Sequence, residues 1–305
     1  MTRRGLLLFA AMCLIWGIPY LFIRIAVTEL TPASLVFFRT ALAALVLLPF
    51  AFRRGTLRPL LVHWKPLVVF SLVEIAVPWL ALSSAEQHLS SSLAGLLIAA
   101  VPLVATVLAL ALGSRDRMGP SALVGLLLGL VGVAAIVGFD LRATGLLPLF
   151  QMALVVVGYA IGPIILARYL SQLPAVSVMT PALLFCAVLY APLAVLQRPQ
   201  VMPSPNVIAS VVVLAVVCTA LAFLLFPGLI AEIGPVRATV ITYINPAVAA
   251  LLGVAVLGET FTGAMGAGFV LVLAGSALAT GQARRPPWAW LRGLPAQLTS
   301  RFQAR

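Results

Sequence analysis

Residues 91–112 read SSLAGLLIAAVPLVATVLALAL, a run of 22 residues without a charged side chain. A helix needs about 20 apolar residues to cross ~30 Å of hydrocarbon, so this run is long enough to span a membrane. Its one proline, Pro102, cannot donate a hydrogen bond to the carbonyl of Ile98. The run therefore predicts a membrane helix that is interrupted near its middle.

Nine further apolar stretches flank this run. We expect them near 5–27, 33–52, 66–85, 118–138, 145–167, 175–196, 206–231, 235–257 and 263–280. Only helices and closed barrels satisfy every backbone group in lipid, and continuous apolar runs favour helices over the alternating strands of a barrel. The sequence predicts an all-α membrane protein with ten transmembrane helices, of which the third and fourth have the weakest separator, Glu86-Gln87-His88.

The composition also indicates a lipid environment. The 305 residues are 63% apolar and 9% charged, whereas a soluble domain carries about 25% charged residues. A net charge of +12 is compatible with nucleic-acid binding, but the basic residues sit in short loops and the tail, so we expect no nucleic-acid partner. The three cysteines lie in apolar runs and nothing has metal-ligand spacing, so we expect no cofactor or metal.

The basic residues predict the orientation of the chain. With the N-terminus inside, the inner segments and the tail hold 15 of the 19 Lys and Arg residues, while the outer loops hold only Arg142 and Arg198. Cytoplasmic loops are enriched in these residues. We therefore expect a multi-pass protein of the cell (inner) membrane with both termini in the cytoplasm.

The two halves of the chain resemble each other. A shift of 144 residues carries Pro19 onto Pro163, Arg24 onto Arg168 and Pro102 onto Pro246. Five helices per repeat is an odd number, so the second repeat must cross the membrane in the inverted direction, as in many secondary transporters. We expect a first repeat at 1–140, a second at 141–280 and a basic cytoplasmic tail at 281–305, which lies on the membrane surface or is disordered.

Three motifs in the second half are shared with a known family: Gly234-Pro-Val-Arg-Ala, Tyr243-Ile-Asn-Pro246 and Leu257-Gly-Glu-Thr260. With them the chain resembles the EamA-type transporters of the drug/metabolite transporter superfamily over roughly residues 6–280. This resemblance implies ten helices in two EamA repeats and the export or exchange of small metabolites. The first half departs from the family where Leu112-Gly113-Ser114 replaces the frequent Leu-Gly-Glu, so no first-half glutamate is inferred at that position.

Ten residues are candidates for contact with a substrate near the middle of the membrane. They are Trp16, Tyr20, Arg39, Glu74, Trp79, Pro102, Tyr159, Tyr243, Asn245 and Pro246. Paired interruptions at the two prolines would point to a midplane site, or they are kinks satisfied by neighbouring helices. The aromatic residues and Asn245 could hold a substrate or simply pack helices together.

Arg39 and Glu74 are the two charged residues that lie well inside their predicted helices. Such residues are costly in lipid unless they face a cavity or a partner. Their helices are consecutive, so the two side chains could form a static ion pair. The functional alternative is that Arg39 receives an anionic group of the substrate while Glu74 binds a proton or a substrate amine.

Other polar residues have structural interpretations. Arg24 lies near a helix end, and its long apolar side-chain stem would let the guanidinium reach the membrane–water interface. Glu259, Thr260 or Thr262 can accept hydrogen bonds from the first amides of the final helix. The Gly125–Gly129 pair and Ala264 with Gly268 predict close helix packing, within the monomer or in a homodimer.

The sequence therefore predicts a secondary transporter whose partners are the lipid bilayer, a small-molecule substrate such as an amino acid, and possible coupling protons. Efflux of drugs or hydrophobic cations is the alternative, and a channel or scaffold ranks below it. No GxxxxGK[ST] loop is present, so the chain is not expected to hydrolyse ATP. Without a HExxH motif or a suitably placed histidine, an intramembrane enzyme is not expected.

Overall fold

The computed structural model describes residues 2–53, 62–111, 120–138, 145–234, 238 and 240–280. Every regular element in these ranges is a helix, which confirms the all-α class. Each of the ten predicted stretches contains helix at its expected place. The predicted basic tail lies outside the described residues.

The helices follow the chain in two sets. In the first half they are α1 (Arg3–Ile15), α2 (Pro19–Ala26), α3 (Pro32–Arg53), α5 (Trp64–Phe70), η1 (Ser71–Ala76), α6 (Val77–Ala85), α7 (Ser91–Ile98), α8 (Val101–Ala111) and α9 (Pro120–Val137). In the second half they are α11 (Leu146–Ile165), η2 (Leu166–Leu170), α12 (Ala175–Leu196), α13 (Pro205–Val212), η3 (Val213–Leu221), α14 (Ala222–Ile233), α16 (Ile241–Leu257) and α17 (Gly263–Ala279). The η segments are π-helical and continue directly into the flanking α-helices.

Seven helical segments within the described residues are long and apolar enough to cross a membrane. They are Arg3–Ala26, Pro32–Phe52, Trp64–Ala85, Ser91–Ala109, Leu146–Leu170, Ala175–Leu196 and Pro205–Ile233. Three further apolar helices, Ser121–Val137, Ile241–Leu257 and Gly263–Ala279, are shorter. The structure thus has seven clear candidate spans, and the total of ten stays a prediction.

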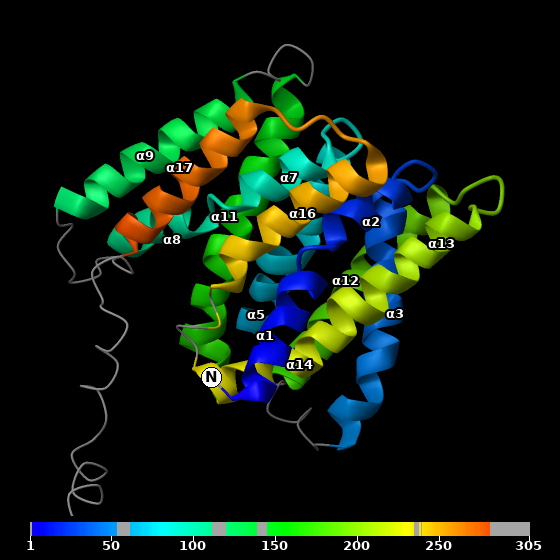
Figure 1. Cartoon of the computed structure of the whole chain (residues 1–305). Coiled ribbons are helices and arrows are strands. Elements are labelled where there is room, and N and C mark those ends of the chain that lie inside the picture. Colours follow the sequence, from blue (N-terminus) through cyan, green and yellow to red (C-terminus); the bar gives the residue numbers. More distant parts are fainter. Residues whose placement is uncertain are drawn as a thin grey trace, which may run out of the picture.

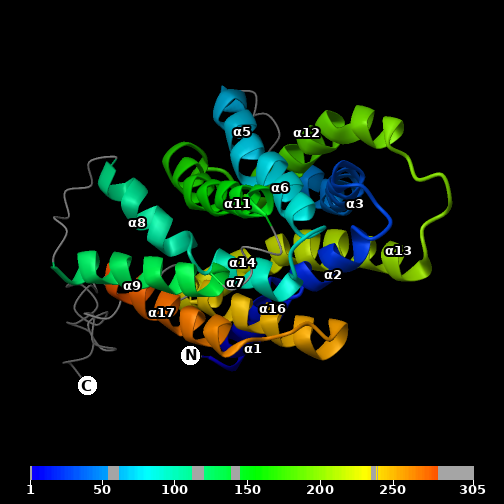
Figure 2. The ribbon, with the colours of Figure 1, turned by 90° about the horizontal axis from the view of Figure 1, so that it is seen from above.

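The glycine-rich helices α9 and α17 pack lengthwise against each other at one edge of the bundle (Figures 1 and 2). A Cβ atom added to Gly125 would lie 2.5 Å from the backbone nitrogen of Ala279, and one added to Gly132 would lie 2.6 Å from the carbonyl oxygen of Gly268. Side chains at these glycines would force the two backbones apart. The predicted close packing of glycine faces is therefore used within the chain.

The two matched prolines behave differently, which corrects the prediction of paired interruptions. The fourth stretch breaks into α7 and α8 at Ala99–Ala100, just before Pro102. In contrast, α16 continues through Pro246 from Ile241 to Leu257. The two helices nevertheless pack side by side, with Gly95 directly against the side chain of Ala249.

Among the described residues, four connections meet at the end of the bundle away from the N-terminus, which we call the distal end (Figure 1). They are residues 27–31, 86–90, 197–204 and 258–262. Glu29 accepts a hydrogen bond from the backbone N–H of Ser204 at 2.7 Å, so the two halves of the chain touch there. At the opposite end, Glu232 accepts a hydrogen bond from Thr2 and pairs with Arg4 at 3.5 Å.

Candidate functional site

Arg39 on α3 is the centre of a buried polar cluster between the two halves of the chain. Its guanidinium carbon lies 3.6 Å from the ring centroid of Trp79 on α6. Its Nε–H donates to the hydroxyl of Thr219 on η3, at 3.2 Å. Arg39 is 7% exposed, and Thr219 is fully buried. A desolvated cation over an indole face is stabilised by about 2 kcal/mol, so this contact holds the planar group in a fixed orientation.

Two tyrosines complete this central cluster. Tyr20 on α2 is buried, and Tyr159 on α11 is half-buried. Both hydroxyl groups are close enough to Arg39 to interact with it electrostatically, and Tyr159 also makes a polar contact with Trp79. Tyr20, Arg39, Trp79 and Tyr159 are four of the predicted site residues, and the fold brings them together from four different helices.

The π-helical segments explain why polar groups can meet here. Pro78 has no N–H to donate to the carbonyl of Glu74 four residues earlier, and the N–H of Val77 bonds to Leu72 five residues back. In η3, the Thr219 hydroxyl donates to the carbonyl of Leu214 at 2.8 Å, again five residues back. Such π-turns displace the side chains around them and are frequent at functional sites.

Glu74 does not pair with Arg39, which corrects the predicted ion pair. Among the described residues, the one ion pair within 4.0 Å is Arg4–Glu232. The Glu74 carboxylate instead lies against Gly162 of α11, and its Oε2 is buried without a hydrogen-bond partner in the described part of the chain. Gly162 is one turn from Tyr159, so Glu74 faces the rim of the central cluster rather than the guanidinium.

The remaining predicted residues lie elsewhere. Trp16 packs on Phe226 of α14, with ring centroids 4.8 Å apart. With its amide nitrogen facing acceptors, Asn245 donates to the carbonyls of Cys13 and Ile241, so it ties α16 to α1. Tyr243 makes its polar contact with Thr280 at the end of α17. Nothing in the described residues brings these three side chains, or Pro102 and Pro246, to Arg39.

Glu259 caps a different helix from the one predicted. Its Oε1 accepts from the N–H of Ser91 at 2.7 Å, and its Oε2 accepts from the N–H of Ser92 at 2.8 Å. The carboxylate therefore caps α7 in the first half of the chain, where the helix dipole favours negative charge. The final helix, α17, is capped by Thr262, whose hydroxyl accepts from Met265 at 3.2 Å. The alternative through Thr262 is thus confirmed.

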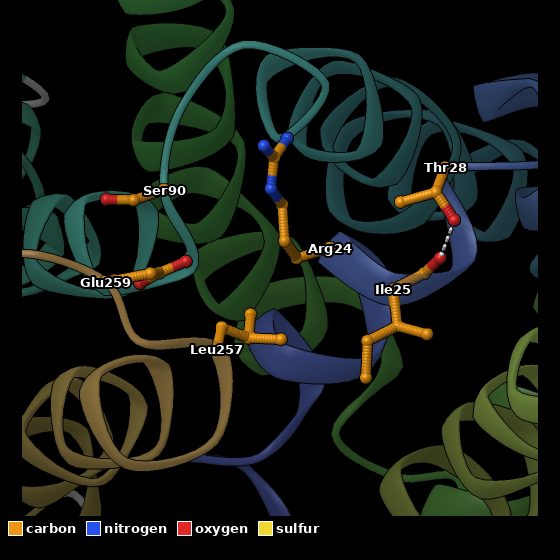
Figure 3. A pocket seen from close by; sticks show the side chains of 6 residues that line it. All are labelled: Arg24, Ile25, Thr28, Ser90, Leu257 and Glu259. Carbon is orange, nitrogen blue, oxygen red and sulfur yellow. Dashed lines mark hydrogen bonds between the residues drawn. The ribbon is translucent and has the colours of Figure 1, made fainter.

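Beside this cap, the distal end is hollowed by a pocket of about 380 Å³. Its lining consists of Arg24, Ile25, Thr28, Ser90, Leu257 and Glu259 (Figure 3). Arg24 does not extend freely to the interface as predicted, because it donates to the backbone carbonyl of Glu86. Figure 3 shows its guanidinium pointing from α2 toward the connection that carries Ser90.

Glu86, beside the distal pocket, and Thr219, in the central cluster, were not predicted as site residues. The sequence predicts Glu86 in a loop, yet it is fully buried, and neither of its carboxyl oxygens has a hydrogen-bond partner among the described residues. Burial, followed by the nearby Glu259 carboxylate, raises the pKa of Glu86 well above its ordinary value. Thr219 gave no signal, because threonines in apolar helices commonly bond only to their own backbone.

Comparison with known proteins gives a consistent result. Residues 3–138 and 146–281 each match the EamA-like transporter family. The chain is 28% identical to the uncharacterized inner membrane transporter YedA of Escherichia coli K12, over 83% of this chain and 82% of that protein. It is 23% identical to an uncharacterized transporter of Archaeoglobus fulgidus, over 92% of this chain and 98% of that protein. A crystal structure with 24% identity shares the fold, with a TM-score of 0.66 over 92% of this chain and 98% of that one.

Proposed function

This chain belongs to the EamA-like transporter family, and we propose that it is a secondary transporter that exports or exchanges small metabolites such as amino acids. Family membership makes it a membrane transporter rather than an enzyme. In the proposed cycle, the central cluster faces alternate sides of the membrane. The cluster suits this role because α3 and α6 belong to the first half of the chain, whereas α11 and η3 belong to the second.

The Arg39 guanidinium is the observation that carries this proposal. Thr219 is its one hydrogen-bond acceptor among the described residues, and that bond uses only Nε–H. The four terminal N–H groups are left to bind a ligand, and their planar fork matches a carboxylate in two parallel hydrogen bonds. A substrate with a carboxylate would replace water on these groups while Trp79 supports the guanidinium from its face.

Glu74 supplies the second half of the proposed recognition. Its Oε2 has no partner and lies against Gly162, whose missing side chain leaves room for the carboxylate. A substrate ammonium or a coupling proton would satisfy this oxygen. An amino acid carries both groups, a carboxylate for Arg39 and an amine for Glu74. The unpartnered Oε2 also favours the second candidate, a hydrophobic cation held by Glu74 and the aromatic side chains.

The proposed arrangement in the membrane follows the sequence. We propose ten spans in two inverted repeats at 1–140 and 141–280, with both termini in the cytoplasm and the distal end outside. The relatives named as inner membrane transporters support the same location for this chain. Because its glycine faces are used between α9 and α17, we propose that a monomer is sufficient for transport and that a homodimer would use other surfaces.

Purified protein tests the function in two steps. A thermal-shift screen with amino acids, other carboxylates and lipophilic cations would identify ligands, and liposome flux would follow on the compounds that stabilise the protein. Saturable uptake stimulated by unlabelled compound inside the liposomes would support a carrier. Flux that is neither saturable nor stimulated would instead indicate a channel. Stabilisation by lipophilic cations alone would favour the second candidate.

A further inference from the structure

Glu86 is a buried carboxyl group at the distal end that nothing in the proposed recognition uses. It directly follows α6 and is fully buried, and within the described ranges neither Oε1 nor Oε2 has a hydrogen-bond partner. An ionised carboxylate without partners is strongly disfavoured in such a place, so the group is neutral in this conformation. No basic side chain of the described residues forms an ion pair with the Glu86 carboxyl group within 4.0 Å.

Five charged or titratable groups among the described residues interact electrostatically with Glu86. Four of them are Arg24 and Tyr20 of α2, Arg39 of α3 and Tyr159 of α11, and of these Arg24 also bonds to the Glu86 backbone carbonyl. Glu259 faces it from the connection between α16 and α17, and its negative charge opposes ionisation of Glu86. The exposed His88 lies two residues further along the chain.

Arg24 contacts both the distal pocket and Glu86. Its side chain lines the pocket (Figure 3). Its guanidinium donates to the backbone carbonyl of Glu86 rather than to the carboxyl group. Arg24 is thus part of the pocket wall, whereas Glu86 is not and both of its carboxyl oxygens are buried. A movement of Arg24 away from this carbonyl would remove the contact between the pocket wall and Glu86 and would let water approach the carboxyl group.

We propose that Glu86 is a proton-exchange site at the distal end, closed in this structure, whose proton is released to water when Arg24 moves away and the distal side opens. The O–H bond of the carboxyl breaks, its electron pair stays on the carboxylate, and the proton passes to water in the pocket. This inference rests on the proposed function insofar as alternating access requires a second state in which the distal side is open.

The sign of the pH effect follows from the two states. The closed state holds the proton more tightly than an open state in which water reaches the Glu86 carboxyl group and stabilises its ionised form. Low pH therefore favours the closed state, and raising the pH favours opening. Glu29, on the same end of the bundle, is the matched control, because its hydrogen bonds from Ser204 lower its pKa and keep it ionised.

Infrared spectroscopy of the full chain in liposomes tests the protonation directly. At neutral pH the wild type should show the carbonyl band of a buried protonated carboxylic acid. Glu86→Gln should remove that band, Glu86→Asp should shift it, and Glu29→Gln should leave it unchanged. Identical spectra for the wild type and both Glu86 variants would overturn the proposal, and the Asp variant keeps the test valid if the Gln variant does not insert.

Cysteine labelling tests the opening, with no need for a substrate. In a background without Cys13, Cys186 and Cys218, Ile25→Cys places a thiol in the half-buried pocket wall and Thr28→Cys places one on its exposed rim. The ratio of their labelling rates with an impermeant maleimide should rise about threefold or more between about pH 5 and about pH 8. With Glu86→Gln the ratio should stay constant, and with Glu29→Gln it should rise as in the wild type.

If the ratio of the two labelling rates did not change with pH in the protein that retains Glu86, the proposal would be overturned even if liposome flux succeeded. Conversely, a failed flux screen with an intact infrared band and labelling response would count against the proposed function and not against this proton site. The two failures are therefore distinguishable.

Discussion

The π-helical segments η1 and η3 occupy matched places in the two halves but carry different chemistry. The repeat shift of 144 residues places residues 71–76 on residues 215–220, inside η3. In η3, the Thr219 hydroxyl is bonded both to Leu214 and to Arg39. In η1, the Glu74 carboxylate has an oxygen without a partner. The same backbone distortion thus holds a cation in place in one half and presents a carboxylate in the other.

Among the variants that test this comparison, Arg39→Ala should have the largest effect on substrate binding. It removes the charge that η3 holds and all of the terminal N–H groups offered to a ligand. Since hydrogen bonds to charged groups contribute about 1.5–3 kcal/mol each, we expect substrate affinity to fall about 100-fold. Binding and counterflow of a ligand found in the screen would measure this loss. Arg168→Ala, at an exposed arginine on η2, is the control and should bind like the wild type.

Glu74→Gln should abolish proton-driven accumulation while retaining exchange. A pH difference of one unit can drive about tenfold accumulation for each coupled proton, and that gain should disappear if the carboxylate of η1 carries the proton. Uptake into liposomes with and without a pH gradient measures both quantities. Wild-type accumulation by this variant would show that η1 has no coupling role.

Thr219→Val should weaken binding by about tenfold, because it removes the acceptor that orients Arg39, a hydrogen bond of about 1.5 kcal/mol. Thr219→Ser keeps the hydroxyl and should restore most of the affinity. Ser71→Ala is the matched change in η1, since Ser71 donates only to the carbonyl of Leu67 at 2.7 Å. Equal losses for Thr219→Val and Ser71→Ala would mean that both hydroxyls serve helix stability alone.

Glu29→Gln should have the smallest effect, on stability rather than transport. Glu29 accepts from Ser204, the residue that precedes α13 and hence the helix that carries η3. Because hydrogen bonding lowers its pKa, the stabilisation is present near neutral pH and is lost as the pH falls through the folded-state pKa. The variant should melt slightly below the wild type at neutral pH, and the difference should vanish in acid. A gap that persisted in acid would exclude the carboxylate as its cause.

The apolar stretches were predictable because hydropathy is a local property of the chain. The expected ranges 33–52 and 175–196 differ from α3 and α12 by at most one residue at either end. The residue types of the central cluster were also predictable, since buried Arg39 and the aromatic residues are conspicuous in an apolar sequence. Glycine spacing likewise predicted the close packing that α9 and α17 realise within the chain.

The partner of each polar side chain was decided by the tertiary structure. Sequence order suggested Glu74 as the partner of Arg39. The rotation of the helices instead brings the hydroxyl of Thr219, 180 residues away in the sequence, to the Arg39 guanidinium. Likewise, Glu259 caps α7 rather than the helix that follows it, and Pro102 interrupts its helix whereas Pro246 does not. Glu86, in a polar triplet typical of a loop, is fully buried, and Arg24 of α2 bonds to its backbone carbonyl. Apolarity determines which segments enter the membrane, but the rotation and tilt of each helix set which polar groups meet, and these depend on all of its neighbours at once.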